Sequence, residues 1–306
     1  AGAAGMTAAA VAAAEGARVL LLEQAAQVGG TTAISGGMVW IPANRAMAAA
    51  GLADSLDDAR RYLGAMLPPG GDAAALEAFL TRGDEAIRYL EARTALRLQP
   101  VLRYPDYEPD RPGATAGGRV LEPVPFDASV LGADFARLRP PLPEFTLFGG
   151  MMIARPDIPH LRRALRSPRS AWHVARLLWR HARERLHAPR GTTLVLGNAL
   201  AGRLLKSVLD LGVELRCGVT VQSLVLDQGR VAGVEFGQGG ARHRVAAARG
   251  VILATGGLSH AGDLRARFVP PMAGTLTATV GSAVAPAGAR LALAAGARLS
   301  DSPAQQ

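Results

Sequence analysis

The sequence predicts an α/β protein with a Rossmann-like dinucleotide-binding core, a helical and loop insertion, and a β-hairpin element. Gly2 and Gly5 precede an alanine-rich helical segment, as in the turn that opens such a core. An apolar run over 19–22 ends in Glu23 and predicts a buried strand with an acid at its carboxyl end. Alternating helix and strand patterns return over 191–257, so both stretches are expected to form one core.

Gly2 and Gly5 fit the last two glycines of a G-x-G-x-x-G turn whose first strand and first glycine are missing from the chain. Gly2 lets the backbone approach a pyrophosphate, and Gly5 lets the helix pack closely on the sheet. The free N–H groups and the dipole of the helix N-terminus favour that anion. Glu23 follows Gly5 by 18 residues and can accept hydrogen bonds from an adenosine ribose. Because the chain starts at Ala1 and not at methionine, we expect a fragment.

A second glycine cluster spans 29–37, where two Gly-Gly pairs bracket three hydroxyl side chains. Its backbone N–H groups and hydroxyls suit the phosphates and the ribityl chain of a flavin nucleotide. A flexible surface turn is the alternative. The residues of this cluster that we predict to bind a cofactor are Gly30, Thr31, Thr32, Ser35, Gly36 and Gly37.

Residues 55–190 separate the two core segments. Apolar residues at helical spacing predict helices over 57–67 and 73–90, which Pro68-Pro69-Gly70-Gly71 separates. Proline and glycine dominate 101–150, and so long a stretch without regular structure inside a compact domain is usually functional or disordered.

The stretch 170–186 predicts a basic amphipathic helix. Two interpretations stay open for it, namely attachment to an anionic membrane surface and a solvated arginine face. His173 and His181 are eight residues apart, but no third ligand stands at metal spacing, so we predict no metal site.

The stretch 191–257 predicts a helix over 198–211 that Gly212 ends. The strands that we expect after it span 214–216, 220–226, 230–236, 244–246 and 250–254. Gln228 and Gly229 predict the turn of a β-hairpin. The last strand leads into Thr255-Gly256-Gly257, a close-approach backbone at the carboxyl end of a strand, where open α/β sheets bind ligands.

Composition limits the classes of function. The chain has 306 residues and 49% hydrophobic content, enough for a large core or two domains. Its net charge is +9, but Lys206 is the only lysine, which indicates a codon bias as much as an acidic partner. The single cysteine, Cys217, excludes an intramolecular disulfide. With no membrane-spanning apolar run and no recognition motif, we expect no transmembrane segment and no nucleic-acid partner.

Four motifs follow one another over 2–42, namely G-A-A-G-M, V-L-L-L-E, V-G-G-T-T-A-I-S-G-G and W-I-P. In order and spacing they resemble the flavoprotein family of fumarate reductases and 3-ketosteroid Δ1-dehydrogenases, and Trp40-Ile41-Pro42 points to the ketosteroid side. The resemblance implies a bound FAD. Besides the glycines above, it implies cofactor contacts at Ala4, Val221, Thr255, Gly256 and Gly257, with adenine held near Val221.

The run Tyr104-Pro105-Asp106-Tyr107, followed by Pro112-Gly113 and Gly117-Gly118-Arg119, resembles a motif that contributes an active-site tyrosine in the ketosteroid dehydrogenases. The resemblance implies a catalytic role for Tyr107, with Tyr104 as second choice, since a phenol can polarise a carbonyl or relay a proton. A tyrosine that only packs on a proline-rich loop is the alternative. Full-length relatives remove two hydrogens beside a ring ketone: a base takes the α-proton, and flavin N5 takes the β-hydride.

One segment departs from the family. Where relatives read T-G-D-G, this chain has Ala285-Pro286-Ala287-Gly288, so the acid near the cofactor is absent. The relatives' C-terminal catalytic part is also missing. We therefore expect an FAD-binding core over 1–54 and 191–280, an inserted cap over 55–190, and the start of a truncated catalytic part over 281–306.

The expected partners are a steroid-like or other hydrophobic ketone and an external electron acceptor. A cytoplasmic location is expected, with peripheral membrane contact through 170–186 as an open alternative. Two other functions stay open. One is a fumarate-reductase-like flavoprotein that acts on dicarboxylates, and the other is a non-catalytic fragment that binds FAD.

Overall fold

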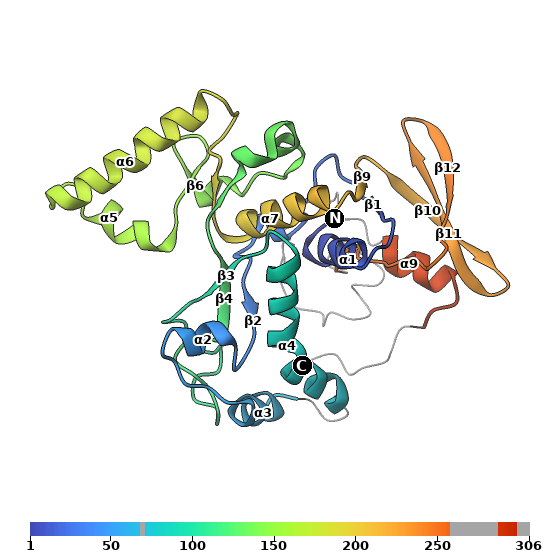
Figure 1. Cartoon of the computed structure of the whole chain (residues 1–306), viewed down its shortest axis with the longest axis horizontal. Helices are drawn as coiled ribbons and strands as arrows, with labels where there is room; N and C mark the ends of the chain where they lie inside the picture. Colours follow the sequence, from blue (N-terminus) through green and yellow to red (C-terminus); the bar gives the residue numbers. More distant parts are fainter. Residues whose placement is uncertain (68–70, 258–286, 299–306) are drawn as a thin grey trace, which may run out of the picture.

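The structure is a computed structural model of the chain that describes residues 1–67, 71–257 and 287–298 (Figure 1). Its helices are α1 (Ala3–Ala14), α2 (Arg45–Ala49), α3 (Leu56–Gly64), α4 (Ala73–Arg93), α5 (Ile158–Arg162), α6 (Pro168–Arg185), α7 (Leu196–Asp210) and α9 (Ala287–Ala294). Short 3₁₀ helices are η1 (Thr32–Ile34), η2 (Ala128–Arg137), η3 (Pro143–Phe145) and η4 (Arg155–Asp157). The strands are β1 (Leu20–Leu22), β2 (Val39–Trp40), β3 (Leu98–Pro100), β4 (Val120–Pro123), β5 (Phe126–Asp127), β6 (Thr146–Leu147), β7 (Met151–Met152), β8 (Thr193–Leu194), β9 (Glu214–Arg216), β10 (Thr220–Asp227), β11 (Arg230–Gln238) and β12 (Ala241–Ala246).

The hydrophobic core forms where α1 packs against α7. Ala9 and Ala10 of α1 are buried in one cluster with Leu204 and Val208 of α7. Because alanine carries only a methyl group, the larger side chains of α7 can approach the backbone of α1. The strands predicted over 19–22 and 214–216, which follow α1 and α7 in the chain, are confirmed. They are β1 and β9, which pair in parallel with Leu21 opposite Leu215.

Helix α7 confirms the helix predicted over 198–211. It begins two residues earlier than expected, at Leu196, and Gly212 follows its end with φ at +69°. The amide of Val213 donates to the Val208 carbonyl at 2.9 Å across this turn. This pattern is a Schellman motif, in which glycine takes the left-handed conformation without a steric penalty.

Three antiparallel strands in the order β10-β11-β12 form a sheet at one end of the molecule (Figure 1). The predicted hairpin turn is confirmed, because Gln228 and Gly229 have φ at +46° and +78° between the paired residues Asp227 and Arg230. Two consecutive positive φ values match the twist of the strands that such a turn joins. Phe236 of β11 is fully buried, stacks on the His243 ring of β12 and lies under the Arg216 guanidinium of β9.

The strand predicted over 250–254 is wrong. Residues 251–257 run without regular secondary structure, and Ile252 is 70% exposed. A strand requires backbone hydrogen bonds to a neighbour, and no such ladder joins this segment to other described residues. The apolar run indicated burial but could not specify a pairing partner.

A second three-stranded sheet has the order β2-β4-β3, with α2, α3 and α4 beside it (Figure 1). The helices predicted over 57–67 and 73–90 are confirmed as α3 and α4, although Pro68, Pro69 and Gly70 between them lie outside the described residues. Ser55 caps α3 by accepting from the Asp58 amide at 3.0 Å, and Asp72 caps α4 by accepting from Ala75 at 2.9 Å.

Arg119, immediately before β4, is fully buried and joins two loops. Its Nε and Nη2 donate to the Asp54 carboxylate at 2.9 and 2.7 Å, and its Nη1 donates to Asp106 at 2.9 Å. Trp40 Nε1 donates to the other Asp106 oxygen at 2.7 Å, and the guanidinium lies over the Trp40 and Tyr62 rings. Burial alone would lower the pKa of Arg119, but the hydrogen bonds and charges of both carboxylates outweigh it and raise the pKa.

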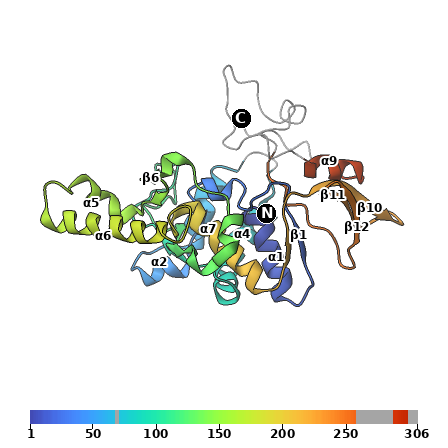
Figure 2. The same cartoon turned by 90° about the horizontal axis from the view of Figure 1, so that it is seen from above.

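Helices α5 and α6 form a hairpin that projects from the end of the molecule opposite the β10–β12 sheet (Figures 1 and 2). The basic helix predicted over 170–186 is confirmed as α6. The His173 ring lies 2.8 Å from an Asp157 oxygen and stacks on His160 at 4.2 Å between ring centroids, which joins the two helices. Among the described residues, no helix is both long and apolar enough to cross a membrane.

We expect Arg119→Met to lower the free energy of unfolding by about 3–5 kcal/mol, because it leaves two buried carboxyl groups without their cation. Urea unfolding followed by circular dichroism measures the change. Arg82→Met is the control, since it breaks an exposed pair with Glu85 and should leave the midpoint unchanged. Equal midpoints for the two variants would contradict a stabilising role for the cluster.

Candidate cofactor site

The N-terminus of α1 is open to an anion. Gly2 is the N-cap residue, no side chain caps the helix, and no acid stands in its first turn. The amide of Ala3 donates to Thr32 Oγ1 at 3.0 Å, whereas the amides of Ala4 and Gly5 bond to no other described residue. Two backbone donors and the positive end of the helix dipole are therefore available to a negatively charged group.

Gly5 lies where α1 meets the core. A Cβ at this position would be 3.5 Å from Ala254 Cβ and 3.9 Å from a methyl group of Leu21 in β1. The predicted close packing of helix on strand is therefore present. The segment that carries Thr255 begins beside the same glycine.

The loop over 29–37 rests on the start of α1. The Gly29 amide donates to the Ala1 carbonyl at 2.8 Å, and Thr32 binds the first helical amide as described. A Cβ on Gly30, whose φ is +49°, would be 3.6 Å from the Gly2 Cα. The structure thus brings the two predicted glycine clusters together, with Gly2 facing Gly30.

The other end of this loop rests on α7. Gly37 has φ at +65°, and a Cβ on it would be 2.5 Å from the Gly197 Cα. A Cβ on Gly197 would overlap the Thr32 carbonyl oxygen. Ser35 closes the loop, since its hydroxyl donates to the Thr32 carbonyl at 2.9 Å and accepts from the Gly37 amide at 3.1 Å. Of the remaining predicted residues, Thr31 is exposed and Gly36 is half-buried.

Two residues that sequence reasoning missed support this loop. Asn198 of α7 is buried, and its Nδ2 donates to the Ala33 and Arg139 carbonyls at 3.1 and 2.8 Å. Arg190 Nη1 donates to Asn198 Oδ1 at 3.0 Å, and its guanidinium lies 4.2 Å from the Phe135 ring centroid. Burial lowers the pKa of Arg190 to about 10, and its Nη2 has no hydrogen-bond partner among the described residues. A polar residue on the apolar face of α7 was the signal that could have revealed Asn198.

Glu23 lies at the end of β1 with its side chain 14% exposed. One carboxylate oxygen accepts from the Ala25 amide at 2.8 Å, and the other contacts the Ala1 amino group. Its carbonyl accepts from the Val219 amide at 3.0 Å, two residues before Val221 in β10. Glu23 is therefore adjacent to the glycine turn, as the ribose prediction requires. Val221 lies near Glu23 because it is two residues beyond Val219, whose amide binds the Glu23 carbonyl.

Thr255, Gly256 and Gly257 follow Ala254 and are exposed. A Cβ on Gly288, in the first turn of α9, would overlap the Thr255 hydroxyl, so α9 touches this segment directly. Ala285 and Pro286, where the chain departs from the family pattern, lie outside the described residues.

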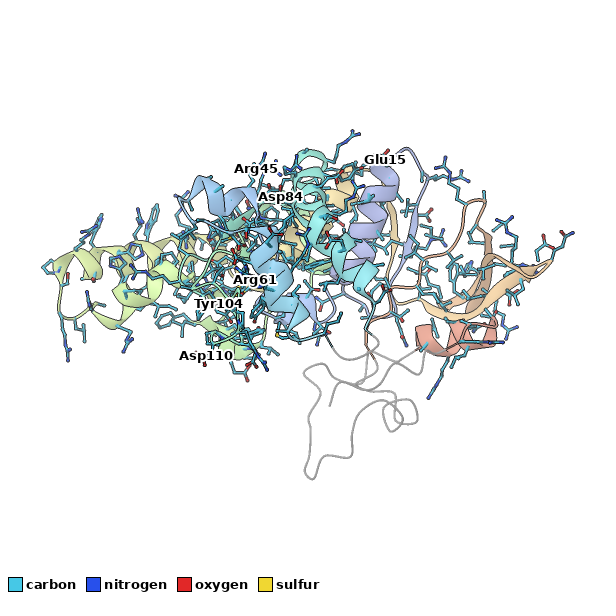
Figure 3. All side chains as sticks on the ribbon, turned by 90° about the horizontal axis from the view of Figure 1, so that it is seen from below. Glu15, Arg45, Arg61, Asp84, Tyr104 and Asp110 are labelled. Atoms are coloured by element: carbon cyan, nitrogen blue, oxygen red, sulfur yellow. The ribbon has the colours of Figure 1, made fainter. Side chains whose placement is uncertain are left out.

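Tyr107 is 88% exposed, and its hydroxyl makes no hydrogen bond to another described residue. Its neighbour Asp106 is buried in the Arg119 cluster, so the loop has a fixed base and an outward tip. Tyr104, labelled in Figure 3, is half-buried under the Arg155 guanidinium at 5.8 Å from its ring centroid. Of the two tyrosines, Tyr107 is the more exposed.

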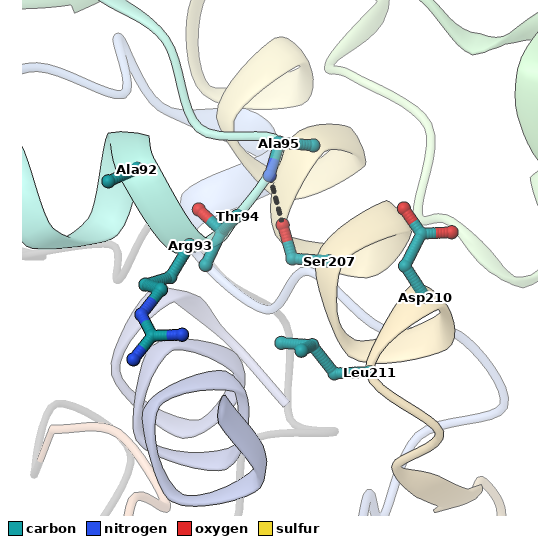
Figure 4. Close-up of a pocket in the computed structure, with 7 residues that line it drawn as sticks. All are labelled: Ala92, Arg93, Thr94, Ala95, Ser207, Asp210 and Leu211. Atoms are coloured by element: carbon teal, nitrogen blue, oxygen red, sulfur yellow. Dashed lines mark hydrogen bonds between the residues drawn. The ribbon is translucent and has the colours of Figure 1, made fainter. Parts of the chain in front are cut away.

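A separate hollow of about 280 Å³ lies between the ends of α4 and α7 (Figure 4). Across it, the Ala95 amide donates to Ser207 Oγ at 3.0 Å. None of the predicted site residues lines this hollow, and it lies at the opposite end of α7 from Gly197. The residues that line it are Ala92, Arg93, Thr94, Ala95, Ser207, Asp210 and Leu211.

An open helix N-terminus against a second glycine loop, with an acid at the end of the adjacent parallel strand, defines a nucleotide-binding α/β domain. The sequence comparison identifies the nucleotide. The FAD binding domain family matches residues 1–306, and the chain belongs to that family. The predicted cofactor, FAD, is therefore confirmed.

Known proteins similar to this chain are dehydrogenases. The chain is 36% identical over 304 residues to the 4-oxocyclohex-2-ene-1-carboxylate 5-dehydrogenase of Sinomonas cyclohexanicum, covering 98% of this chain and 51% of that protein. It is 34% identical over 273 residues to the 3-oxosteroid 1-dehydrogenase of Mycolicibacterium smegmatis, covering 87% and 47%. The crystal structure of 3-ketosteroid delta1-dehydrogenase from Sterolibacterium denitrificans, in complex with 1,4-androstadiene-3,17-dione, superposes with a TM-score of 0.84 at 33% identity, covering 97% and 54%.

The predicted resemblance to the ketosteroid dehydrogenases is thus confirmed, and the chain spans about half the length of these relatives. The residues present fit FAD, because the amides of Ala4 and Gly5 have no partner among the described residues, and Gly2 and Gly30 place no side chain beside them. A pyrophosphate would supply the negative charge that no acidic side chain provides at this helix N-terminus.

We expect Gly197→Ala to weaken FAD binding about tenfold or more, because the new methyl group must displace the Thr32 backbone. A fluorescence titration of apoprotein with FAD measures the Kd, and circular dichroism checks that the variant is folded. The matched control is Gly64→Ala at the end of α3, where a Cβ meets no atom within 4 Å. A folded Gly197→Ala protein with the Kd of the control would show that this contact does not shape the site.

Proposed function

We propose that this chain is the FAD-binding part of a flavin-dependent dehydrogenase that acts on 3-ketosteroid-like substrates. The observation that carries the proposal is the open α1 N-terminus held against the glycine loop, in a chain similar along almost its whole length to dehydrogenases of ring ketones. Bound FAD would supply the oxidant for removing two hydrogens from adjacent ring carbons. The protein would hold the cofactor and polarise the substrate ketone.

Each predicted residue takes a part in holding FAD. The first turn of α1 binds the pyrophosphate through the amides of Ala4 and Gly5, and Gly2 gives the backbone room to approach it. Glu23 accepts from the adenosine ribose, and the backbone near Val221 holds adenine. The phosphates and the ribityl chain would contact Gly30, Thr31, Thr32, Ser35, Gly36 and Gly37, and the flavin nucleotide would also contact Thr255, Gly256 and Gly257.

We assign these roles to a core over 1–54 and 191–280 and the candidate tyrosine to an inserted cap over 55–190. Residues 281–306 would begin the catalytic part that relatives carry. The whole protein would need an external electron acceptor, and the helix over 170–186 would contact a membrane that holds lipid-like substrates. A fumarate-reductase-like activity and a non-catalytic FAD-binding fragment are the alternatives that the assays below separate.

FAD-loaded protein is expected to oxidise a 3-ketosteroid with a redox dye as acceptor, while succinate gives no dye reduction. The assay starts from protein desalted after incubation with excess FAD, so that its visible flavin absorbance reports the bound cofactor. A 4-oxocyclohexene carboxylate is the competing substrate. Faster turnover of this acid would overturn the steroid assignment, and protein that retains FAD but oxidises none of the three would be a non-catalytic FAD-binding fragment.

Tyr107→Phe is expected to lower kcat on the preferred ketone by about 10²-fold or more, because it removes the hydroxyl that would polarise the carbonyl or relay a proton. FAD absorbance after desalting should be unchanged. Tyr104→Phe is the matched control, with a smaller effect expected because that ring packs under Arg155. If Tyr107→Phe keeps the wild-type kcat while Tyr104→Phe does not, the second choice of tyrosine is the correct one.

A further inference from the structure

The segment Arg137-Leu138-Arg139 runs beside the start of the glycine loop. The Val28 amide donates to the Arg137 carbonyl at 2.8 Å, and the Arg139 amide donates to the Val28 carbonyl at 2.9 Å. Val28 and Leu138 form a parallel bridge between the two segments and are buried, with 0% and 1% exposure. A Cβ on Gly29 would be 3.7 Å from the Arg139 Cβ, so this arginine lies directly beside the loop.

Arg137 and Arg139 lie on the face of the segment opposite to Leu138. Leu138 is extended, with φ at −86° and ψ at +122°, and side chains alternate between two faces along an extended backbone. Arg137 shows where this face leads, because its Nη2 donates to the Leu215 carbonyl of β9 at 2.8 Å. β9 runs parallel to β1, so its carboxyl end lies at the edge of the sheet that carries Glu23. Arg139 is therefore on the face turned to the ligand-binding edge.

The two arginines differ in what they bind. Arg137 Nη1 pairs with Asp134 at 2.9 Å, so its charge is neutralised within the fold. Arg139 is half-buried, and its side chain has no hydrogen bond, ion pair or ring contact to another residue that the structure describes. Removing a cation from water is costly unless it is paired. The side chain of Arg139 is therefore available to an anionic ligand.

The carbonyl side of Arg139 is held against the same loop. Asn198 Nδ2 donates to the Arg139 carbonyl at 2.8 Å and to the Ala33 carbonyl at 3.1 Å. Arg190 donates to Asn198 Oδ1 at 3.0 Å, which brings a second cation close to the loop. Neither arginine is bonded to a carboxylate among the described residues. The resulting positive potential favours an anion beside the loop.

We propose that the Arg139 guanidinium binds the pyrophosphate of FAD, together with the amides of Ala4 and Gly5. This inference rests on the proposed placement of the pyrophosphate at the start of α1. The helix amides provide only a partial positive charge, whereas arginine would provide a full one. Its planar group of five N–H donors also matches two phosphate oxygens at once, which a lysine ammonium does not.

The experiment is a fluorescence titration of the apoprotein with FAD at several salt concentrations. Arg139→Gln should raise the Kd for FAD about tenfold or more and make it less dependent on salt, because a charge-assisted hydrogen bond is lost. Arg139→Lys keeps the charge without the planar group and should give an intermediate Kd. The matched control is Arg18→Gln, which removes the same charge at an exposed position before β1, at the other end of that strand from Glu23. Its Kd should equal that of the wild type.

ADP tests which part of the cofactor the arginine binds, since it carries the pyrophosphate without the flavin. In displacement of FAD by ADP, Arg139→Gln should lose affinity for ADP by the same factor. A loss for FAD alone would place the guanidinium at the flavin and overturn the assignment to the pyrophosphate. The apoprotein of Arg139→Gln should unfold at the wild-type temperature, because Arg139 has no partner in the fold.

Two further outcomes would also overturn the role of Arg139. One is an equal Kd for FAD in Arg139→Gln and Arg18→Gln, and the other is a lower unfolding temperature of the Arg139→Gln apoprotein, which would assign the side chain to the fold. Failure of the wild-type protein to bind FAD is a distinct result, because it would contradict the proposed site as a whole and this inference with it.

Discussion

The close approach of three backbone segments around Thr32 is the constraint on which the rest of the core depends. The start of α1, the loop over 29–37 and the start of α7 meet through Gly2, Gly37 and Gly197, and a side chain at Gly37 or Gly197 would overlap neighbouring atoms. Thr32 links them, since its hydroxyl takes the first amide of α1 and its carbonyl lies against Gly197. Only one helical amide is used in this contact, so the next two remain for an anion. The packing that closes the fold therefore also leaves the cofactor site open.

The sheet of β2, β3 and β4 depends in the same way on one buried charge. Trp40, Asp106 and Arg119 come from three motifs far apart in the sequence, yet they form a single hydrogen-bonded cluster. The Asp106 carboxylate also accepts from the Thr115 amide at 2.9 Å, and neutral donors of this kind offset the excess of carboxylates over cations. The motif that contains Tyr107 thus has a buried half, which fixes the loop, and an exposed half, which carries the phenol.

Local signals explain what could be predicted from the sequence. The helices over 57–67 and 73–90, the end of α7 at Gly212 and the hairpin turn at Gln228 each depend on residues a few positions apart, and the structure has all of them. The elements that could not be predicted from the sequence depend on pairing between segments far apart in the chain. The strands around β4 are two to four residues long and have no period to detect, and the apolar run over 250–254 was wrongly predicted as a strand.

The same distinction applies to the site. Gly2, Gly5 and the loop over 29–37 could be found because glycine spacing reports close backbone approach directly. Arg190 could not, because its importance arises from its hydrogen bond to the Asn198 side chain. For Asn198 the sequence offered one signal, a polar residue on the apolar face of α7, but not the Ala33 and Arg139 carbonyls that it binds.

The hairpin and the candidate tyrosine are connected through one residue. Arg155, at the start of η4 and so of the segment leading into α5, pairs with Glu122 of β4 at 3.2 Å and covers the Tyr104 ring. Because β4 directly follows Arg119, these contacts continue into the cluster that anchors the loop of Tyr107. The hairpin is therefore connected through Arg155 to the base of the loop that carries Tyr107. Contacts of this kind fix an orientation and provide no second arrangement, which a regulatory coupling would require. We therefore interpret Arg155 as a fixed link between the hairpin and the tyrosine loop.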